Sequence, residues 1–509
     1  MKRNFATAVV ALASLFFVGA TVAEAVDVKF GGQLRPRFEI GDHGMANGST
    51  GATTAGFDER QDAQKIFSTR ARLSADASIN DQTSAFIQLQ SVGVWGAATN
   101  INGSGSRNAF VANDNNVDVG LHQAYFNLKN FFTLPVDLMV GRQEVVLDGH
   151  RLLGNTDWTQ GAQAHDAIRL THSQGDHTIV YAFSKALTVS TVSTGDLGSK
   201  HDVNVHVLWG NLKNLLHANS GLSLYFVAVD DGCSPTTAQT ACNNTVATTA
   251  TGGTRNDNNI YTFGFRQAGN LAQIWGIDYR AEFYYQTGDA AGDSAVANSS
   301  LGYGSGTVNN GVDRGAYMFG VRVGKTFNDV MWKPGVTVWY DQLSGTDDSD
   351  VRDKKFRTFN TLFDTGHKFY GYMDLFLPAN GANSAFLGLR DLAGKFSVKP
   401  LDKTSVNADI HAFWTETDVN DNPNIRTNLS IPANSAADSN HLGEELDLTI
   451  VHNYNPNTNI TLGYSHFWAD DLFYAVNGKA TGVGLNASGA RAANGQNASW
   501  GYVMFDVKF

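Results

Sequence analysis

The sequence predicts an all-β fold, an antiparallel up-and-down β-barrel of about 18 strands that crosses a membrane. Three observations predict it: apolar and polar residues alternate in many segments, no long apolar run follows the N-terminal one, and the last segment alternates up to Phe509. Side chains of a strand point to opposite faces in turn, so alternation gives one apolar and one polar face. In a membrane barrel the apolar faces meet lipid and the polar faces line a wet lumen.

Both ends of the chain fit this fold. Two basic residues precede an apolar run, and a small-x-small cleavage pattern ends at Ala25, so we expect a signal peptide over 1–25 and a single barrel domain over 26–509. No later apolar run reaches the roughly 18 residues that a membrane helix needs. The C-terminal segment resembles the signal by which Gram-negative outer-membrane barrels are recognised for assembly.

Composition excludes several function classes. Charged residues make up 17% of the 509 residues, Gly (52) and Phe (31) are frequent, and Pro (9) is scarce, which suits strands and tight turns. The net charge of −11 argues against a nucleic-acid partner. Because no nucleophile elbow, His-Glu-x-x-His motif or haem-attachment motif occurs, we predict no enzyme, no cofactor and no metal site.

Eighteen segments show the alternation. In the clearest, 273–286, aromatic and aliphatic residues from Trp275 onward occupy the odd positions, and Asp278, Arg280 and Glu282 occupy even ones. The others are 33–40, 70–79, 87–90, 117–129, 134–144, 164–172, 176–188, 201–212, 220–230, 258–267, 315–327, 334–343, 385–399, 404–416, 441–453, 458–469 and 498–509. Short turns between segments alternate with long polar stretches, which predicts periplasmic turns and extracellular loops.

The alternation places many charged side chains on the lumen face. The inward cations are Arg35, Arg37, Arg70, Arg72, Arg169, Arg266, Arg280 and Arg322, and the inward anions are Glu39, Asp76, Asp278, Glu282, Asp409, Glu445 and Asp447. Two interpretations stay open: ion pairs that stiffen the barrel, or unpaired arginines that attract an anionic solute. Arg280 has carboxylates on both sides, so the four arginines of the first two segments are the better candidates for an anion site.

The two cysteines, Cys233 and Cys242, lie in one long polar stretch. In an exported protein such a pair predicts a disulfide that closes the loop. Metal binding by two thiols alone is the weaker alternative.

Three motifs resemble those of the alginate export family of outer-membrane barrels: 141–144 with 148–154, 157–158 and 166–169; then 362–376; then 388–392. The resemblance implies an 18-stranded barrel in the outer membrane of a Gram-negative bacterium, through which an anionic polysaccharide or a smaller solute passes passively along an arginine-rich constriction. Matched residue by residue, it assigns site or motif roles to Arg142, Asp148, Arg151, Asp157, Trp158, Asp166, Arg169, His367, Lys368, Asp374, Arg390 and Asp391.

Two of these assignments carry a structural condition. Arg142 shares its parity with the apolar Leu138 and Val140, so it reaches the lumen only through a bulge or above the lipid band. Trp158 in its turn could pack the loop or contact a solute, and both interpretations stay open.

The sequence therefore supports two hypotheses from different classes. The first is an outer-membrane channel, surrounded by lipid, for an anionic or polar solute. The second is a structural or interaction barrel whose lumen is closed by loops or occupied by a periplasmic or other partner protein.

Overall fold

The computed structural model describes residues 26–41, 64–95, 119–187, 203–231, 258–290, 301–303, 311–376, 384–428, 431, 439–477 and 497–509. The expected signal peptide, 1–25, and the expected Cys233–Cys242 disulfide lie outside the described residues.

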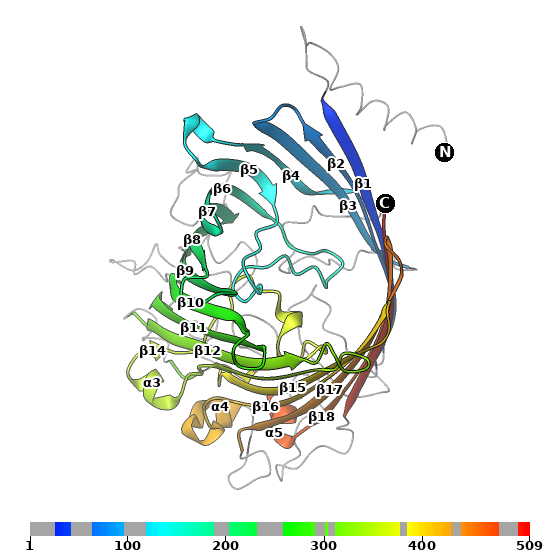
Figure 1. The fold of residues 1–509 in the computed structure, drawn as a ribbon. Helices are drawn as coiled ribbons and strands as arrows, with labels where there is room; N and C mark the ends of the chain where they lie inside the picture. Colours follow the sequence, from blue (N-terminus) through cyan, green and yellow to red (C-terminus); the bar gives the residue numbers. More distant parts are fainter. Residues whose placement is uncertain are drawn as a thin grey trace.

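The described residues form one closed antiparallel barrel (Figure 1). Its wall strands are β1 (Asp27–Gly41), β2 (Gln64–Ser78), β3 (Thr83–Val94), β4 (Gly120–Leu128), β5 (Asp137–Gln143), β6 (His165–Gln174), β7 (His177–Leu187), β8 (Val203–Lys213), β9 (Ser220–Asp231), β10 (Ile260–Leu271), β11 (Ile277–Asp289), β12 (Asp313–Thr326), β13 (Gly335–Leu343), β15 (Leu389–Leu401), β16 (Thr404–Trp414), β17 (His441–Asn455), β18 (Thr458–Ala469) and β19 (Ala498–Lys508). Of the 19 strands in the described part, only β14 (Lys355–Phe356), which pairs in parallel with β12, is not in the wall. The predicted 18-stranded barrel is confirmed.

The alternating segments coincide with the strands, with one local difference. β11 begins at Ile277, and Trp275 lies in the preceding turn, where it and Gly276 have positive φ angles of 56° and 66°. Trp275 is 81% exposed at this turn. Trp275 was expected toward lipid or its interfaces, and it lies in the turn before the strand.

Short helices occur only in turns and loops of the described chain: η1 (Phe131–Thr133), α3 (Asp348–Arg352), η4 (Gly366–Lys368), η6 (Val419–Asp421), α4 (Pro423–Asn428) and α5 (Asp471–Asn477). Asp347 in the acidic stretch before α3 caps this helix, because its carboxylate accepts a hydrogen bond from the Asp350 backbone N–H. No described helix is both long and apolar enough to cross a membrane.

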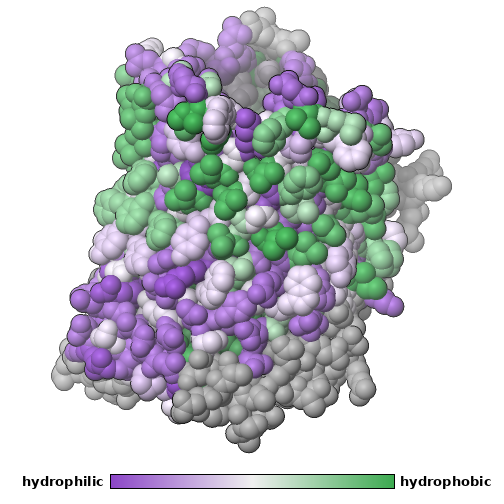
Figure 2. Space-filling model, turned by 60° about the horizontal axis from the view of Figure 1, so that its bottom comes forward, coloured by the Kyte–Doolittle hydropathy of each residue, from purple (hydrophilic) through white to green (hydrophobic). Residues whose placement is uncertain are grey.

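The outer face of the wall carries an apolar band. Figure 2 shows it as a green zone beside a more hydrophilic one. Exposed side chains such as Leu392, Phe396 and Ile410 alternate with inward ones along the strands. Because apolar side chains point outward at every second position of a strand, the charged side chains between them point into the lumen.

The ring closes between β1 and β19, where the last residue seals the seam. The backbone groups of Gly32 and Phe509 exchange two hydrogen bonds, of 2.6 and 3.1 Å. The Phe509 ring lies so close to Gly32 that a Cβ there would collide with it. A side chain at position 32 would therefore displace the Phe509 ring.

We predict that an arginine on the lipid face destabilises the barrel much more than one in the lumen. Leu73 on β2 is 52% exposed on the outer face of the wall. Leu73→Arg puts a charge there and should lower the free energy of unfolding by up to about 2–4 kcal/mol. Gln88→Arg on β3 is the control, because Gln88 faces inward and bonds Gln123. Urea unfolding in lipid vesicles measures both. Equal losses would contradict the orientation of the wall.

Candidate functional site

The segment that joins β5 to β6, residues 144–164, crosses the lumen and is called here the crossing loop. Figure 1 shows it passing through the middle of the barrel. Its apolar side chains Val145, Leu147, Leu152 and Leu153 are buried. The charged side chains of the crossing loop extend in the other directions, toward the walls.

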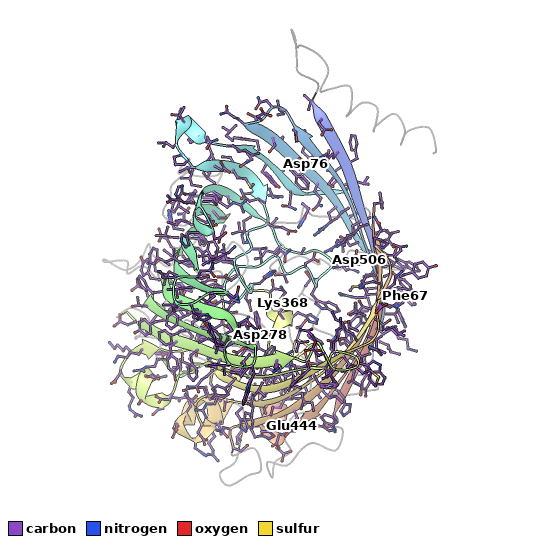
Figure 3. The ribbon with its side chains drawn as sticks, in the orientation of Figure 1. Phe67, Asp76, Asp278, Lys368, Glu444 and Asp506 are labelled. Atoms are coloured by element: carbon purple, nitrogen blue, oxygen red, sulfur yellow. The ribbon has the colours of Figure 1, made fainter. Side chains whose placement is uncertain are left out.

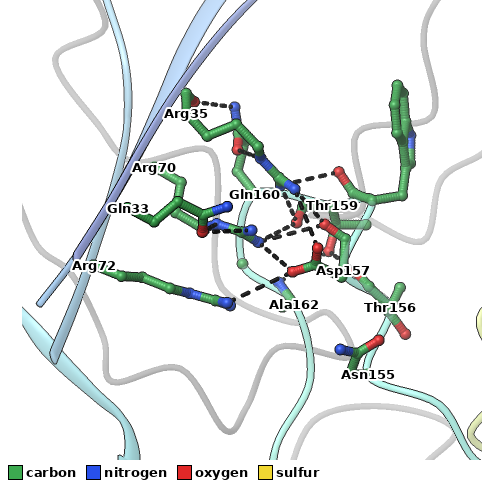
Figure 4. A network of polar contacts seen from close by, with 12 residues as sticks. Gln33, Arg35, Arg70, Arg72, Asn155, Thr156, Asp157, Thr159, Gln160 and Ala162 are labelled. Carbon is green, nitrogen blue, oxygen red and sulfur yellow. Dashed lines mark hydrogen bonds and ion pairs between the residues drawn. The ribbon is translucent and has the colours of Figure 1, made fainter. Parts of the chain in front are cut away.

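Four inward arginines of β1 and β2 meet the crossing loop at one wall. Arg35 and Arg70 are direct cross-strand partners, an arrangement in which like charges repel. The Asp157 carboxylate lies 3.5 Å from Arg35, 2.9 Å from Arg70 and 3.6 Å from Arg72 (Figure 4). Backbone carbonyls of the loop accept further hydrogen bonds from Arg35. We call this the Asp157 clamp.

The four arginines favoured as anion-site candidates contact groups of the chain itself. Arg35, Arg70 and Arg72 crowd together, their side chains are less than 10% exposed, and they share the Asp157 carboxylate as an ion-pair partner. Arg37 is used in the same way, because it pairs with Glu39 at 2.8 Å. The guanidinium groups of these four arginines are therefore bonded to other groups of the chain.

Trp158 packs in a stack that joins two loops. The Arg37 guanidinium lies 4.2 Å from the centre of its ring, and the His367 ring lies parallel to it at 3.9 Å. His367 in turn stacks on Tyr372 and bonds Asp374 at 3.0 Å. The loop-packing interpretation of Trp158 describes this geometry.

At the opposite wall the crossing loop presents a cation to buried carboxylates. Arg151 lies 3.0 Å from Glu282 on β11 and 2.6 Å from Asp341 on β13, and the three side chains are at most 2% exposed. Nearby, Asp148 accepts hydrogen bonds from Trp209 and Tyr225. Since β2 and β11 are nine positions apart in an 18-membered ring, the crossing loop ties opposite walls together.

Three inward arginines near this wall are less completely paired. Arg280 and Arg322 are direct cross-strand partners on β11 and β12, and Arg266 lies on β10. Their side chains stay 14–19% exposed, and their nearest carboxylates are at 3.5–3.6 Å, beyond good hydrogen-bond distance. Five of their nitrogen atoms are buried without an acceptor in the described part of the chain. We call these three residues the arginine row.

Arg169 faces inward and donates a hydrogen bond to the Met139 sulfur at 3.2 Å. Arg142 and Arg390 do not line the lumen. Arg142 pairs in regular register with Asp166 and binds both of its carboxylate oxygens on the outward face, so no bulge turns it inward. Arg390 shares the outward parity of exposed Leu392 and donates to a backbone carbonyl.

The later motifs place residues in the lumen from a second loop, 357–376. Figure 3 shows Lys368 near the middle of the barrel. This second loop runs against the crossing loop, since Leu153 and Phe363 form a parallel bridge. Asp391 faces inward on β15 and bonds His411 and Trp339.

Asp341 was not among the residues predicted for the site. Its position in the segment 334–343 shares parity with buried Trp339, so alternation alone would have placed it inward.

Arginine neighbours control the ionisation of Asp157. Burial disfavours its charged form, but Arg70, Arg35 and Arg72 outweigh burial and hold the pKa of this carboxyl below its usual range. The clamp is therefore present above the ordinary carboxyl pKa and is lost only as the pH falls through the lowered value.

We predict that Arg151→Gln destabilises the barrel by about 3 kcal/mol, because Glu282 and Asp341 lose their hydrogen-bonded cation in a buried position. Arg352→Gln is the control, since its side chain is 68% exposed in α3 and such pairs contribute little. Chemical unfolding of the purified barrel measures the difference. A loss no larger than that of the control would show that Arg151 does not tie the wall.

We predict a pH-dependent effect for Asp157→Asn. At neutral pH the variant should be less stable by about 1 kcal/mol, the low end for charged hydrogen bonds because Asp157 is half exposed. The difference from the unmodified protein should survive the ordinary titration of carboxyl groups at about pH 4 and disappear only in stronger acid, as the pH falls through the lowered pKa of Asp157. Unfolding midpoints across pH test this, with Asp176→Asn in an exposed turn as control. A difference already lost at about pH 4 would contradict the clamp.

Comparisons with known proteins agree with this architecture. The family model described as alginate export matches residues 14–483. A search of curated proteins found no match. Similar solved structures include Pseudomonas aeruginosa OccK8 (OprE) and OccK9 (OpdG), each with a TM-score of 0.53, 11% identity and coverage of 95% of this chain and 98% of that chain. P. aeruginosa OpdL has a TM-score of 0.52, 9% identity and coverage of 95% and 99%.

The structural likenesses, at such low identity, show the fold. The family match spans most of the chain, including all three motifs noted in the sequence. The chain therefore belongs to the alginate export family, and its barrel is a channel for solutes in the outer membrane of a Gram-negative bacterium.

Proposed function

We propose that the channel passes anionic or polar solutes by diffusion, and that the arginine row is the place where an anionic group binds. The observation that carries the proposal is the contrast between two arginine clusters. Arg35, Arg70 and Arg72 are covered by Asp157, whereas Arg280 and Arg322 retain buried nitrogens without acceptors. Unsatisfied buried donors are costly, so this site gains most from an added acceptor.

The chemistry of the row suits a carboxylate or a similar oxyanion. A guanidinium offers a planar fork of donors, and a carboxylate accepts two of them at once. Arg322 is also held in place, because its guanidinium lies 3.7 Å from the centre of the Trp339 ring. These features support passage of a uronate polysaccharide such as alginate, or of smaller acids.

A second candidate is a structural barrel closed by its own loops. One observation favours it: the crossing loop and the second loop contribute Leu152, Leu153, Phe359, Phe369 and Tyr370 to one buried apolar cluster inside the barrel. Such packing leaves less room for a solute, and also less for a partner protein.

We predict ion current when the purified protein is inserted into a planar bilayer, with a reversal potential that shows anion preference. Arg280→Gln and Arg322→Gln should each reduce that preference and weaken block by a uronate oligosaccharide about tenfold, the equivalent of one charged hydrogen bond. Arg352→Gln, which removes a charge from an exposed helix, is the control.

Two results would overturn parts of this proposal separately. Absence of current from correctly folded protein would favour the closed structural barrel. Current with cation preference would keep the channel and reject the arginine row as an anion site.

A further inference from the structure

A turn of the second loop is held against the wall by two carboxyl groups of β17. The backbone N–H of Met373 donates to Glu445 Oε1 at 2.9 Å, and that of Tyr372 donates to Asp447 Oδ2 at 3.2 Å. Gly371 has a φ of +82° and lies so close that a Cβ would collide with the Glu445 carboxyl. The loop backbone is thus fitted to this pair of acids.

The two acids form one buried pair of carboxyl groups. Glu445 and Asp447 occupy successive inward positions of β17, so their side chains lie on the same face of the strand. Asp447 already accepts from Ser465 at 2.5 Å and from Tyr372. Glu445 Oε2 is buried and receives no donor within the described chain. A proton on Glu445 Oε2 removes one of the two buried charges and turns this atom into a donor, so one proton suffices for the pair.

The surrounding charges are already paired. The neighbouring pairs are Lys395–Asp409, His411–Asp391 and His367–Asp374. No ion pair to Glu445 or Asp447 is formed by the described cations. Glu445 is 0% exposed and Asp447 is 1% exposed. A second negative charge on this pair would have no partner in a site closed to water.

We propose that Glu445 and Asp447 form a proton-operated latch that holds the turn 371–373 against the wall and releases it when the shared proton leaves. In the latched state the pair retains one proton. In the released state both carboxyls face water and are ionised at neutral pH. Latching therefore takes up a proton, so it is favoured at low pH and is lost as the pH rises.

Release of the turn changes the lumen because the same loop supports its packing. Tyr372 stacks on His367, which stacks on Trp158 of the crossing loop. Movement of Tyr372 away from β17 therefore loosens the contact between the two loops that occupy the lumen. Channel conductance is the property that reports this change.

The first experiment measures single-channel conductance and current fluctuation from about pH 5 to about pH 9, a range that covers the titration of buried carboxyl groups. Both should rise with pH in the unmodified protein. Glu445→Gln keeps an oxygen that accepts from the Met373 N–H and has an amide donor in place of the protonated carboxyl, so the rise should disappear. Asp278→Asn, an inward carboxyl bonded to Asn270 outside the loops, should keep it.

The second experiment does not depend on conduction, so failure of the latch and failure of the channel are distinguishable. Infrared spectra should contain the carbonyl band of a protonated carboxylic acid that vanishes at high pH and is missing in Glu445→Gln. His367 and His411 remain in that variant, so a pH response that the variant loses does not come from them. An unchanged band in Glu445→Gln, or the same pH response in the variant and the unmodified protein, overturns the proposal.

Discussion

Neutralisation of charge inside the barrel is the constraint on which the rest of the structure depends. One side of the wall carries the closely packed Arg35, Arg70 and Arg72, the opposite side carries the buried Glu282 and Asp341, and burial of either set is costly without partners. The crossing loop meets both needs, since it brings Asp157 to Arg35, Arg70 and Arg72, and brings Arg151 to Glu282 and Asp341. The position of the crossing loop follows from that exchange of charges.

The wall could be predicted from the sequence because strand periodicity is local. Alternation assigned the face of Arg280 and Glu445 and the outward parity of Arg142, and it gave the strand count. The loop contacts could not be predicted, because Asp157 and Arg151 lie in a segment without period whose partners are more than 80 residues away. The height of each side chain along the barrel axis could not be predicted either, because the pairing register sets it. This register places Arg35 opposite Arg70 and Arg280 opposite Arg322.

The two arginine clusters show why counting charges in a lumen is a poor guide to function. Both contain cross-strand arginine pairs, and in the cluster with more arginines the guanidinium donors are bonded by groups of the protein itself. The arginine row stands out only when individual nitrogen atoms are considered, because its members have carboxylates nearby that are too distant for good hydrogen bonds. Membership in the alginate export family fits either cluster, so the geometry of single donors, and not the family, favours the row.

The span of the crossing loop has a mechanical consequence. A ring of 18 strands, held together by hydrogen bonds along its circumference, can flatten into an ellipse with little change in any one strand pair. The crossing loop is fixed to opposite walls by ion pairs at both ends, and this connection opposes the deformation. The width of the passage is then set by the reach of Asp157 and Arg151, and lateral pressure from the surrounding membrane has little influence on it.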